Sequence, residues 1–129
     1  MSNDIVWDIV SKRSCFLVKR KNPVVIFSGE KGNLRNVNTK KFSGLANDQV
    51  VDIRAPLTKR RGVNFGFRPA FRRRWRKPRK QFTNWKVKKG SFERMSKIVA
   101  QKTKQHRPEL VKASLERMAK MKHLQKRRK

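Results

Sequence analysis

The stretch that decides the predicted fold runs from residue 15 to residue 27 and reads CFLVKRKNPVVIF. Two short runs of β-branched and aromatic residues, 15–19 and 24–27, flank a basic segment that ends in Lys-Asn-Pro, a combination that favours a turn. The pattern predicts two short strands that pair as an antiparallel hairpin.

A short helix is expected before this hairpin, over residues 3–11. Ser2 or Asn3 can cap it, and Asp4 suits the positive end of its dipole. Apolar residues recur there at helical spacing with Trp7 beside them. The recurring residues are Ile5, Val6, Ile9 and Val10.

Residues 28–47, which follow the hairpin, are rich in glycine and asparagine and predict a loop, and residues 50–53 predict a third short strand. These elements indicate a small α+β globular domain over residues 1–55. We expect its core to consist of Trp7, Phe16, Leu17, Val25 and Phe27.

The charge of the chain is strongly positive and unevenly spread. The 129 residues include 37 Lys or Arg and 8 Asp or Glu, a formal net charge of +29. Residues 1–55 are the most apolar part, residues 56–90 contain no acid at all, and residues 91–129 are again basic. Because such self-repulsion destabilises a compact state unless it is neutralised, the composition indicates a nucleic-acid partner rather than a membrane.

Residues 56–90 combine phenylalanine and tryptophan with arginine and predict a basic, aromatic-rich RNA-binding arm. Guanidinium groups bind phosphates and stack on bases, and aromatic rings stack on unpaired bases. The alternative is a basic strand pair whose aromatic residues pack on the domain. Together with the basic tail, the predicted RNA-binding residues are Lys59, Arg60, Arg61, Arg68, Phe71, Arg72, Arg73, Arg74, Trp75, Arg76, Lys77, Arg79, Lys80, Lys126, Arg127 and Arg128.

Residues 91–129 predict two basic amphipathic helices. Ser91 can cap the first, which should end before Pro108, and Pro108 suits the first position of the second. Their apolar faces are expected to pack on the globule, on each other or on another protein, and their outer Lys and Arg stripes to reach phosphates. At this charge density we expect residues 56–129 to be largely disordered without RNA.

No catalytic or metal-binding pattern is recognisable, so we expect neither an enzyme nor a cofactor. His106 and His123 lack partners at metal-ligand spacing, and no glycine-rich segment ends as a nucleotide-binding loop does. Cys15 is expected to be a small core residue in a reducing compartment. The apolar start, interrupted by Asp4 and Asp8, predicts neither a signal peptide nor a membrane span, so an intracellular protein is expected.

Several short motifs resemble the eukaryote-type large-subunit ribosomal protein family numbered twenty-eight, which is unrelated to the bacterial protein of that number. They are Trp7, the run SCFLVKR at 14–20, Phe27-Ser28, Glu30, Asn33-Leu34, the run FSGLAN at 42–47 and Arg107-Pro108-Glu109-Leu110. The resemblance covers the first half well and the last third loosely, whereas residues 56–90 match only in being basic.

The resemblance implies a structural constituent of the large (60S) subunit of the cytoplasmic ribosome, which transits the nucleus and nucleolus for assembly. Its implied partners are large-subunit rRNA and neighbouring large-subunit ribosomal proteins, with no membrane and no small-molecule substrate. One alternative is a nucleolar ribosome-assembly factor of the same superfamily, which shares the Asp4-Ile5-Val6-Trp7 opening. A histone-like basic protein that binds duplex DNA is the other.

Overall fold

A computed structural model gives the fold of the chain and describes residues 2–18, 21, 24–55, 62–70, 77, 81–88 and 91–127. Helix α1 (Asn3–Arg13) comes first, and strands β1 (Leu17–Val18) and β2 (Phe27–Ser28) pair antiparallel. The arrangement of antiparallel strands, an N-terminal helix and C-terminal helices confirms the α+β prediction.

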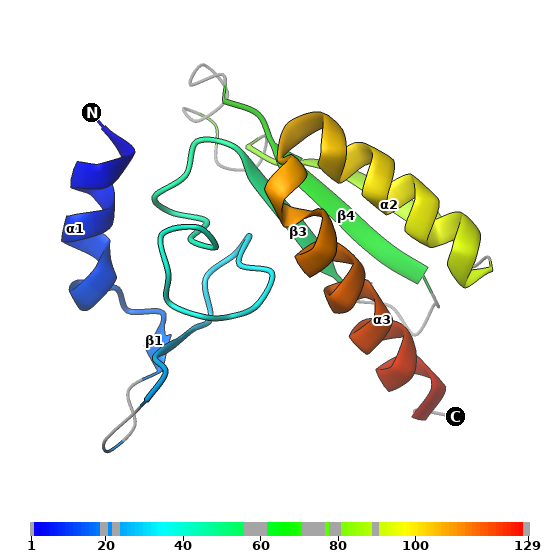
Figure 1. Cartoon of the computed structure of the whole chain (residues 1–129), viewed down its shortest axis with the longest axis horizontal. Coiled ribbons are helices and arrows are strands. Elements are labelled where there is room, and N and C mark those ends of the chain that lie inside the picture. Colours follow the sequence, from blue (N-terminus) through cyan, green and yellow to red (C-terminus); the bar gives the residue numbers. More distant parts are fainter. Residues whose placement is uncertain are drawn as a thin grey trace.

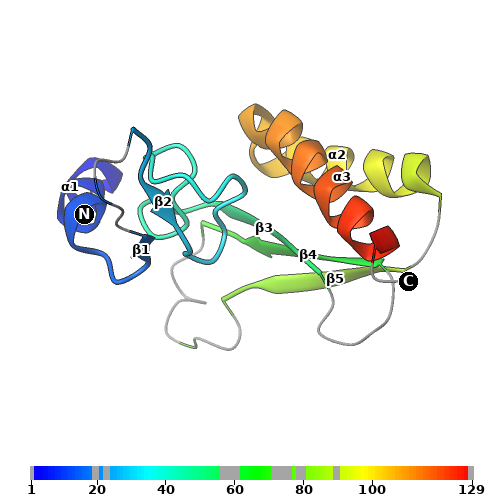
Figure 2. The same cartoon turned by 90° about the horizontal axis from the view of Figure 1, so that it is seen from below.

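A three-stranded antiparallel sheet forms the centre of the molecule. Its strands are β3 (Val50–Arg54), β4 (Gly62–Arg68) and β5 (Thr83–Lys88), in the order β3-β4-β5. Helices α2 (Phe92–His106) and α3 (Val111–Arg127) lie side by side over one face of this sheet (Figures 1 and 2). A short 3-10 helix, η3 (Pro108–Leu110), joins the two helices.

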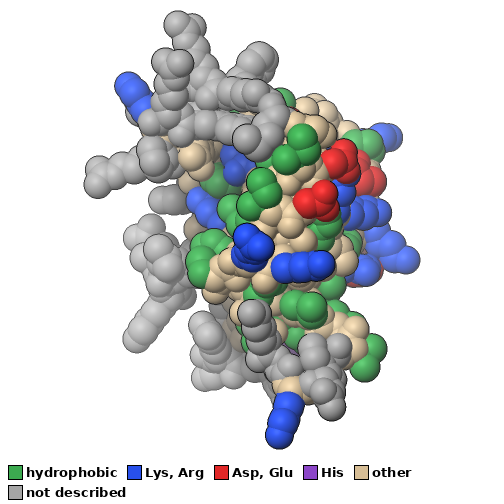
Figure 3. All heavy atoms as spheres, turned by 90° about the vertical axis from the view of Figure 1, so that its left-hand side faces the viewer, with side chains coloured by type: hydrophobic (Ala, Val, Ile, Leu, Met, Phe, Trp, Pro, Cys, Tyr) green, Lys and Arg blue, Asp and Glu red, His purple; other side chains and the backbone are tan. Residues whose placement is uncertain are grey.

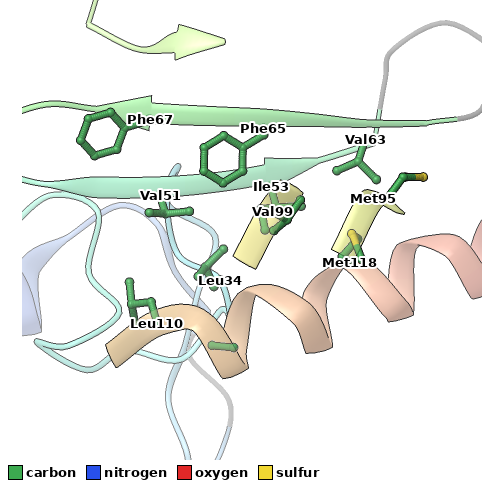
Figure 4. Close-up of a cluster of buried hydrophobic side chains, with 11 residues drawn as sticks. Leu34, Val51, Ile53, Val63, Phe65, Phe67, Met95, Val99, Leu110 and Met118 are labelled. Carbon is green, nitrogen blue, oxygen red and sulfur yellow. The ribbon is translucent and has the colours of Figure 1, made fainter. Parts of the chain in front are cut away.

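The hydrophobic core lies between this sheet and the two helices (Figure 4). Alternate residues of β3 and β4 point toward the helices, as a period of two requires, so Val51 pairs with Phe67 and Ile53 with Phe65. The remaining members of the cluster are Leu34, Val63, Met95, Val99, Leu110, Ala113 and Met118. The core therefore draws on all three predicted segments of the chain, and the division at residues 55 and 90 describes charge rather than packing.

The predicted N-terminal core is wrong. Phe16, Val25 and Phe27 are exposed, Trp7 is half-buried, and α1 contains no buried residue. The hairpin itself forms as predicted, with Val18 opposite Phe27. Its strands are shorter than the β-branched and aromatic runs 15–19 and 24–27 from which it was predicted. Within the described residues no helix or sheet covers it, because α2 and α3 pack on the other sheet.

The helix ends agree with the capping residues that the sequence indicates. The Ser2 hydroxyl accepts a hydrogen bond from the Asp4 N–H (3.3 Å), and the Ser91 hydroxyl accepts one from the Arg94 N–H (3.3 Å). Helix α2 ends at His106, immediately before Arg107 and Pro108, as expected. Met95 and Val99 of α2 are buried, whereas Phe92 and Ile98 are partly exposed.

Helices α2 and α3 meet through small polar side chains. Thr103 and Ser114 are both fully buried. The Thr103 hydroxyl donates to the Val99 carbonyl oxygen (2.8 Å), and the Ser114 hydroxyl donates to the Val111 carbonyl oxygen (2.7 Å). Each hydroxyl is thus satisfied within its own helix, which permits close approach of the two backbones. None of the described helices is long and apolar enough to cross a membrane.

Candidate nucleic-acid interface

Most of the predicted RNA-binding residues lie outside the described part of the chain. Arg68, at the end of β4, and the exposed Lys77 are described, and Lys126 and Arg127 belong to the last turn of α3. The predicted residues outside the described ranges are Lys59, Arg60, Arg61, Phe71, Arg72, Arg73, Arg74, Trp75, Arg76, Arg79, Lys80 and Arg128.

Arg68 has an internal role that the sequence does not reveal. Its guanidinium donates hydrogen bonds to the carbonyl oxygens of Gly44 (2.7 Å), Asn47 and Asp48 (3.4 Å). Burial lowers the pKa of Arg68 from its ordinary value, and the carboxylates of Asp48 and Glu30 oppose that shift. The side chain therefore anchors the 42–48 segment to the end of the sheet.

Arg107 anchors the same loop from the helical side. Its guanidinium donates to the Gln49 carbonyl oxygen (3.3 Å), to the Lys41 carbonyl oxygen (3.1 Å) and to the Glu109 carboxylate (2.6 Å). Desolvation of Glu109 is the largest influence on its pKa and raises it, but the hydrogen bonds from Arg107 and the backbone, together with the charges of Arg107 and Lys41, lower the pKa of Glu109 overall. The planar guanidinium, with five donors, suits this combination of carbonyl and carboxylate partners.

A buried polar network shapes the loop between β2 and β3. Glu30 accepts hydrogen bonds from the Asn33 amide (3.2 Å) and from the Ser43 hydroxyl (3.2 Å), and all three side chains are buried. The Asn33 amide also donates to the Val37 carbonyl oxygen (2.8 Å). The two donors satisfy the Glu30 carboxyl group, so its burial leaves no unpaired acceptor there.

Two glycines allow the backbone of this loop to close. At Gly32 the φ angle is +85°, and a Cβ there would lie 2.0 Å from the Val50 side chain. At Gly44 a Cβ would lie 1.9 Å from the Lys31 carbonyl oxygen. Both contacts are far closer than any side chain allows, so the loop requires glycine at both positions.

One group of accessible cations lies on α2 and α3. Helix α2 contains four Lys or Arg residues and one acidic residue, and helix α3 contains six Lys or Arg residues and one acidic residue. The four ion pairs between described side chains use none of the Lys and Arg residues of these helices within residues 94–104 and 112–122. The exposed ones are therefore available to an external anion. They are Arg94, Lys97, Lys104, Lys112 and Lys120.

The aromatic residues of the predicted arm divide between the core and the surface. Phe65 and Phe67 are buried, so the packing alternative holds for these two. The Phe67 ring stacks on the His106 ring with centroids 3.4 Å apart, and Trp85, which is 40% exposed, lies beside Phe65. Burial and then the nearby Lys102 lower the pKa of His106, so the stacked ring is held neutral.

The geometry brings no metal or nucleophilic centre together in the described part of the chain. No group of three His, Cys, Asp or Glu side chains there could hold a metal ion. Cys15 was expected in the core, but it is an exposed free thiol. An open polar depression of about 450 Å³ lies beside Arg107, and Ala70, which precedes the predicted arginine cluster in the sequence, lines it.

The model of the Ribosomal L28e protein family matches residues 5–124, almost the whole chain. The chain belongs to the Ribosomal L28e protein family. This confirms the family that the short motifs indicate.

Three curated relatives of this L28e family member are named large ribosomal subunit protein eL28. The relative from Dictyostelium discoideum is 44% identical over 55 residues, which is 43% of this chain and 40% of the relative. The Caenorhabditis elegans relative is 42% identical over 55 residues, 43% of this chain and 44% of its own. The relative from Schizosaccharomyces pombe is 38% identical over 56 residues, 43% of this chain and 42% of its own. The matched part thus spans less than half the length of these relatives.

The residues that carry the L28e resemblance mostly build the loop between β2 and β3. Glu30, Asn33 and Ser43 form its polar network, Gly44 permits its closure, and Arg107 holds it to η3. None of these contacts needs RNA. These motif residues therefore act as scaffold.

Proposed function

We propose that this L28e family member is a structural constituent of the large subunit of the cytoplasmic eukaryotic ribosome and binds large-subunit rRNA. The observation that carries the proposal is the set of exposed, unpaired cations on α2 and α3, which stand on a rigid sheet–helix unit. Folded RNA presents closely spaced phosphates that such a surface can neutralise with release of counterions. The three relatives named as large ribosomal subunit proteins support the same role.

The proposed interface has two parts. The first is the outer surface of the helices, above all Lys97 and Lys104 of α2 and Lys112 and Lys120 of α3. The second is the basic segment 68–80 with its aromatic residues Phe71 and Trp75, together with Lys59, Arg60, Arg61 and the tail from Lys126. Arg68 belongs to the second part by sequence, but its bonds to the 44–48 carbonyl oxygens give it a positioning role there.

Sucrose-gradient fractionation of cell extracts tests the proposed assembly. A structural ribosomal protein co-sediments with mature large subunits in the cytoplasm. A nucleolar assembly factor would instead be confined to precursor particles, and a histone-like protein would follow chromatin and leave it as salt is raised. Transit through the nucleus and nucleolus, which we propose for newly made chains, is tested by imaging a pulse-labelled tagged protein.

The salt dependence of rRNA binding separates the two parts of the interface. Replacement of Arg72, Arg73 and Arg74 by Ala should reduce the slope of log affinity against log salt by roughly 0.7 to 0.9 for each lost phosphate contact. As the matched control, Phe71→Ala with Trp75→Ala should weaken binding but leave the slope unchanged, because stacking releases no counterions. An unaltered slope in the arginine variant, with a reduced slope for Lys97→Ala and Lys104→Ala, would assign the electrostatic anchor to α2 instead.

A further inference from the structure

Trp85 is a large aromatic side chain that the core covers only in part. The register places Trp85 opposite Phe65, so both residues lie on the helix-covered face of the sheet. Phe65 in β4 is 2% exposed, whereas Trp85 in the neighbouring strand β5 is 40% exposed. Strand β5 is the last strand of the sheet among the described residues, and Figure 2 shows it at the outer edge. Trp85 therefore lies at the rim of the core and is partly open to solvent.

The indole ring of Trp85 is supported from the inside of the molecule. Its centroid lies 5.9 Å from that of the Phe65 ring, and the two ring planes are inclined by 35°. Phe65 itself is enclosed by the core cluster between the sheet and the helices. A flat ring that rests on a buried ring is already ordered, so a ligand that stacks on it would lose little affinity to ordering of the side chain.

A lysine of α2 stands over the Trp85 ring. The Lys102 Nζ atom lies 5.6 Å from the ring centroid, which is close to the limit of about 6 Å for an attractive contact between a cation and a ring. The flexible lysine side chain can therefore leave the ring and reach an external phosphate. Burial and then the charge of Lys102 lower the pKa of His106, so the ammonium group also lies near a second aromatic ring, one turn further along α2.

The surroundings of Trp85 are basic. Strand β5 contains no acidic residue, and the one acidic residue of α2, Glu93, lies about 14 Å from Lys102 along the helix axis. Among the described residues, Lys102 takes part in none of the four ion pairs. Figure 3 shows a different situation at the α1 end, where acidic side chains occur together with basic and apolar ones. The rim at Trp85 thus combines an exposed aromatic ring with a positive charge that no ion pair compensates.

An unpaired nucleotide is the ligand that matches this combination. Its base presents a flat π-face that stacks on an indole ring, and its phosphate attracts an ammonium group. A base in a continuous duplex is already stacked and paired, so it cannot lie on the ring. A protein partner would contact this rim through apolar side chains, and Ile98, which is 41% exposed and lies one turn before Lys102 on α2, would then take part.

We propose that Trp85 and Lys102 form a binding site for one unpaired nucleotide of large-subunit rRNA, with the base stacked on Trp85 and the phosphate bound by Lys102. The inference rests on the proposed function, because it specifies the kind of rRNA element that this edge of the molecule binds. The exposed cations of α2 and α3 can neutralise the phosphates of any RNA, whereas Trp85 requires a base that is not paired. The site therefore adds selectivity for a loop, a bulge or a single strand.

Photochemical crosslinking in the assembled particle tests the stacking. The tagged full chain is incorporated into large subunits depleted of this protein, and the subunits are irradiated with short-wavelength ultraviolet light. After digestion with protease and ribonuclease, mass spectrometry locates the adducts. We expect a nucleotide attached to the peptide that contains Trp85, because crosslinking without a linker requires contact between base and ring. Trp85→Phe should keep an adduct at position 85, and Trp85→Leu should lose it.

Binding of variants to the depleted subunits separates the two halves of the site. Trp85→Leu should weaken binding about five- to 150-fold, the effect of one base stacked on an aromatic ring, without changing the salt slope. Lys102→Gln should reduce the slope of log affinity against log salt by roughly 0.7 to 0.9, the effect of one phosphate contact. Ile98→Ala is the matched control: Ile98 is 41% exposed and Trp85 40%, and this change should alter neither quantity.

Melting curves of each variant show whether the fold is intact, since Trp85 also contacts Phe65. If Trp85→Leu lowers the melting temperature, the crosslink of the wild-type chain and the salt slope of Lys102→Gln still decide, because neither depends on that variant.

The outcomes separate this inference from the proposed function. A chain that does not enter the depleted subunits overturns the proposed function and this inference with it. A chain that enters them but gives no nucleotide adduct at Trp85, or an adduct to a neighbouring protein there, overturns the inference alone. Equal losses of binding in Ile98→Ala and Trp85→Leu would show that a protein covers this rim instead. An unchanged salt slope in Lys102→Gln would overturn the assignment of the phosphate to Lys102.

Discussion

The N-terminal hairpin and the sheet–helix unit are built from the same kinds of residue, yet only the second buries them. Phe65 in β4 is 2% exposed, whereas Phe16 beside β1 is 45% exposed. The difference lies in what covers each sheet, because α2 and α3 cover one face of β3-β4-β5 and the described residues supply no such cover for β1-β2. β-branched and aromatic content therefore indicates a strand, but a core requires a partner layer.

The largest effect that tests this contrast is expected at Phe65. Phe65→Ala should lower the free energy of unfolding by about 3 to 5 kcal/mol, because it leaves a cavity between the sheet and the helices. Urea denaturation followed by circular dichroism measures it. A loss below about 1 kcal/mol would mean that the sheet–helix layer is not the stabilising core.

A smaller loss is expected in the loop that joins the two regions. Gly44→Ala should cost about 1 to 3 kcal/mol, because the added methyl group would overlap the Lys31 carbonyl oxygen and the loop must shift. At Gly29 the nearest atom is 3.8 Å away, so Gly29→Ala should stay within about 0.5 kcal/mol. Equal effects of the two changes in the same denaturation assay would contradict the close approach.

Trp7 offers the counterpart of Phe65 in the other region. Because its ring is only half-buried and α1 has no buried residue, Trp7→Ala should cost about 1 kcal/mol in the isolated protein. A loss in the isolated protein as large as that of Phe65→Ala would show that α1 packs on a core of its own.

The smallest effect is a pH dependence of stability at His106. Its folded-state pKa lies below the ordinary value of 6.5, because burial and Lys102 disfavour the charged ring. The unfolded state therefore binds more protons, so stability should fall as pH is lowered below about 6.5 and be fully present above it. His106→Gln should remove this slope in melting curves recorded across that range, and an unchanged slope would assign it to other groups.

The local elements could be predicted from the sequence because their signals are local. Ser2 and Ser91 mark helix starts, Pro108 marks a boundary, and the β-branched run at 50–53 marks a strand. The position of the core could not be predicted in the same way. Phe65 and Phe67 stand in the most basic part of the chain, and only long-range pairing with β3 shows that they face inward.

The candidate interface was predictable in kind but not residue by residue. Net charge and arginine content indicate a phosphate-rich partner, yet an arginine that binds phosphate and one that binds backbone carbonyl oxygens look alike in sequence. Arg68 and Arg107 are of the second type, as their contacts to the 41–49 segment show. The exposure of the apolar residues of α1 was not predicted, because apolar residues at helical spacing are typical of a helix face that packs against a core.

The separation in sequence of the core residues bears on when the chain can fold during its synthesis. Leu34 and Met118 belong to one cluster, and the helix that carries Met118 ends at Arg127, next to the last residues of the chain. The cluster cannot close until residue 118 has left the translating ribosome. Until then a highly cationic chain exposes Phe65 and Phe67 to the cell, and domains with such late contacts are prone to misassembly and aggregation.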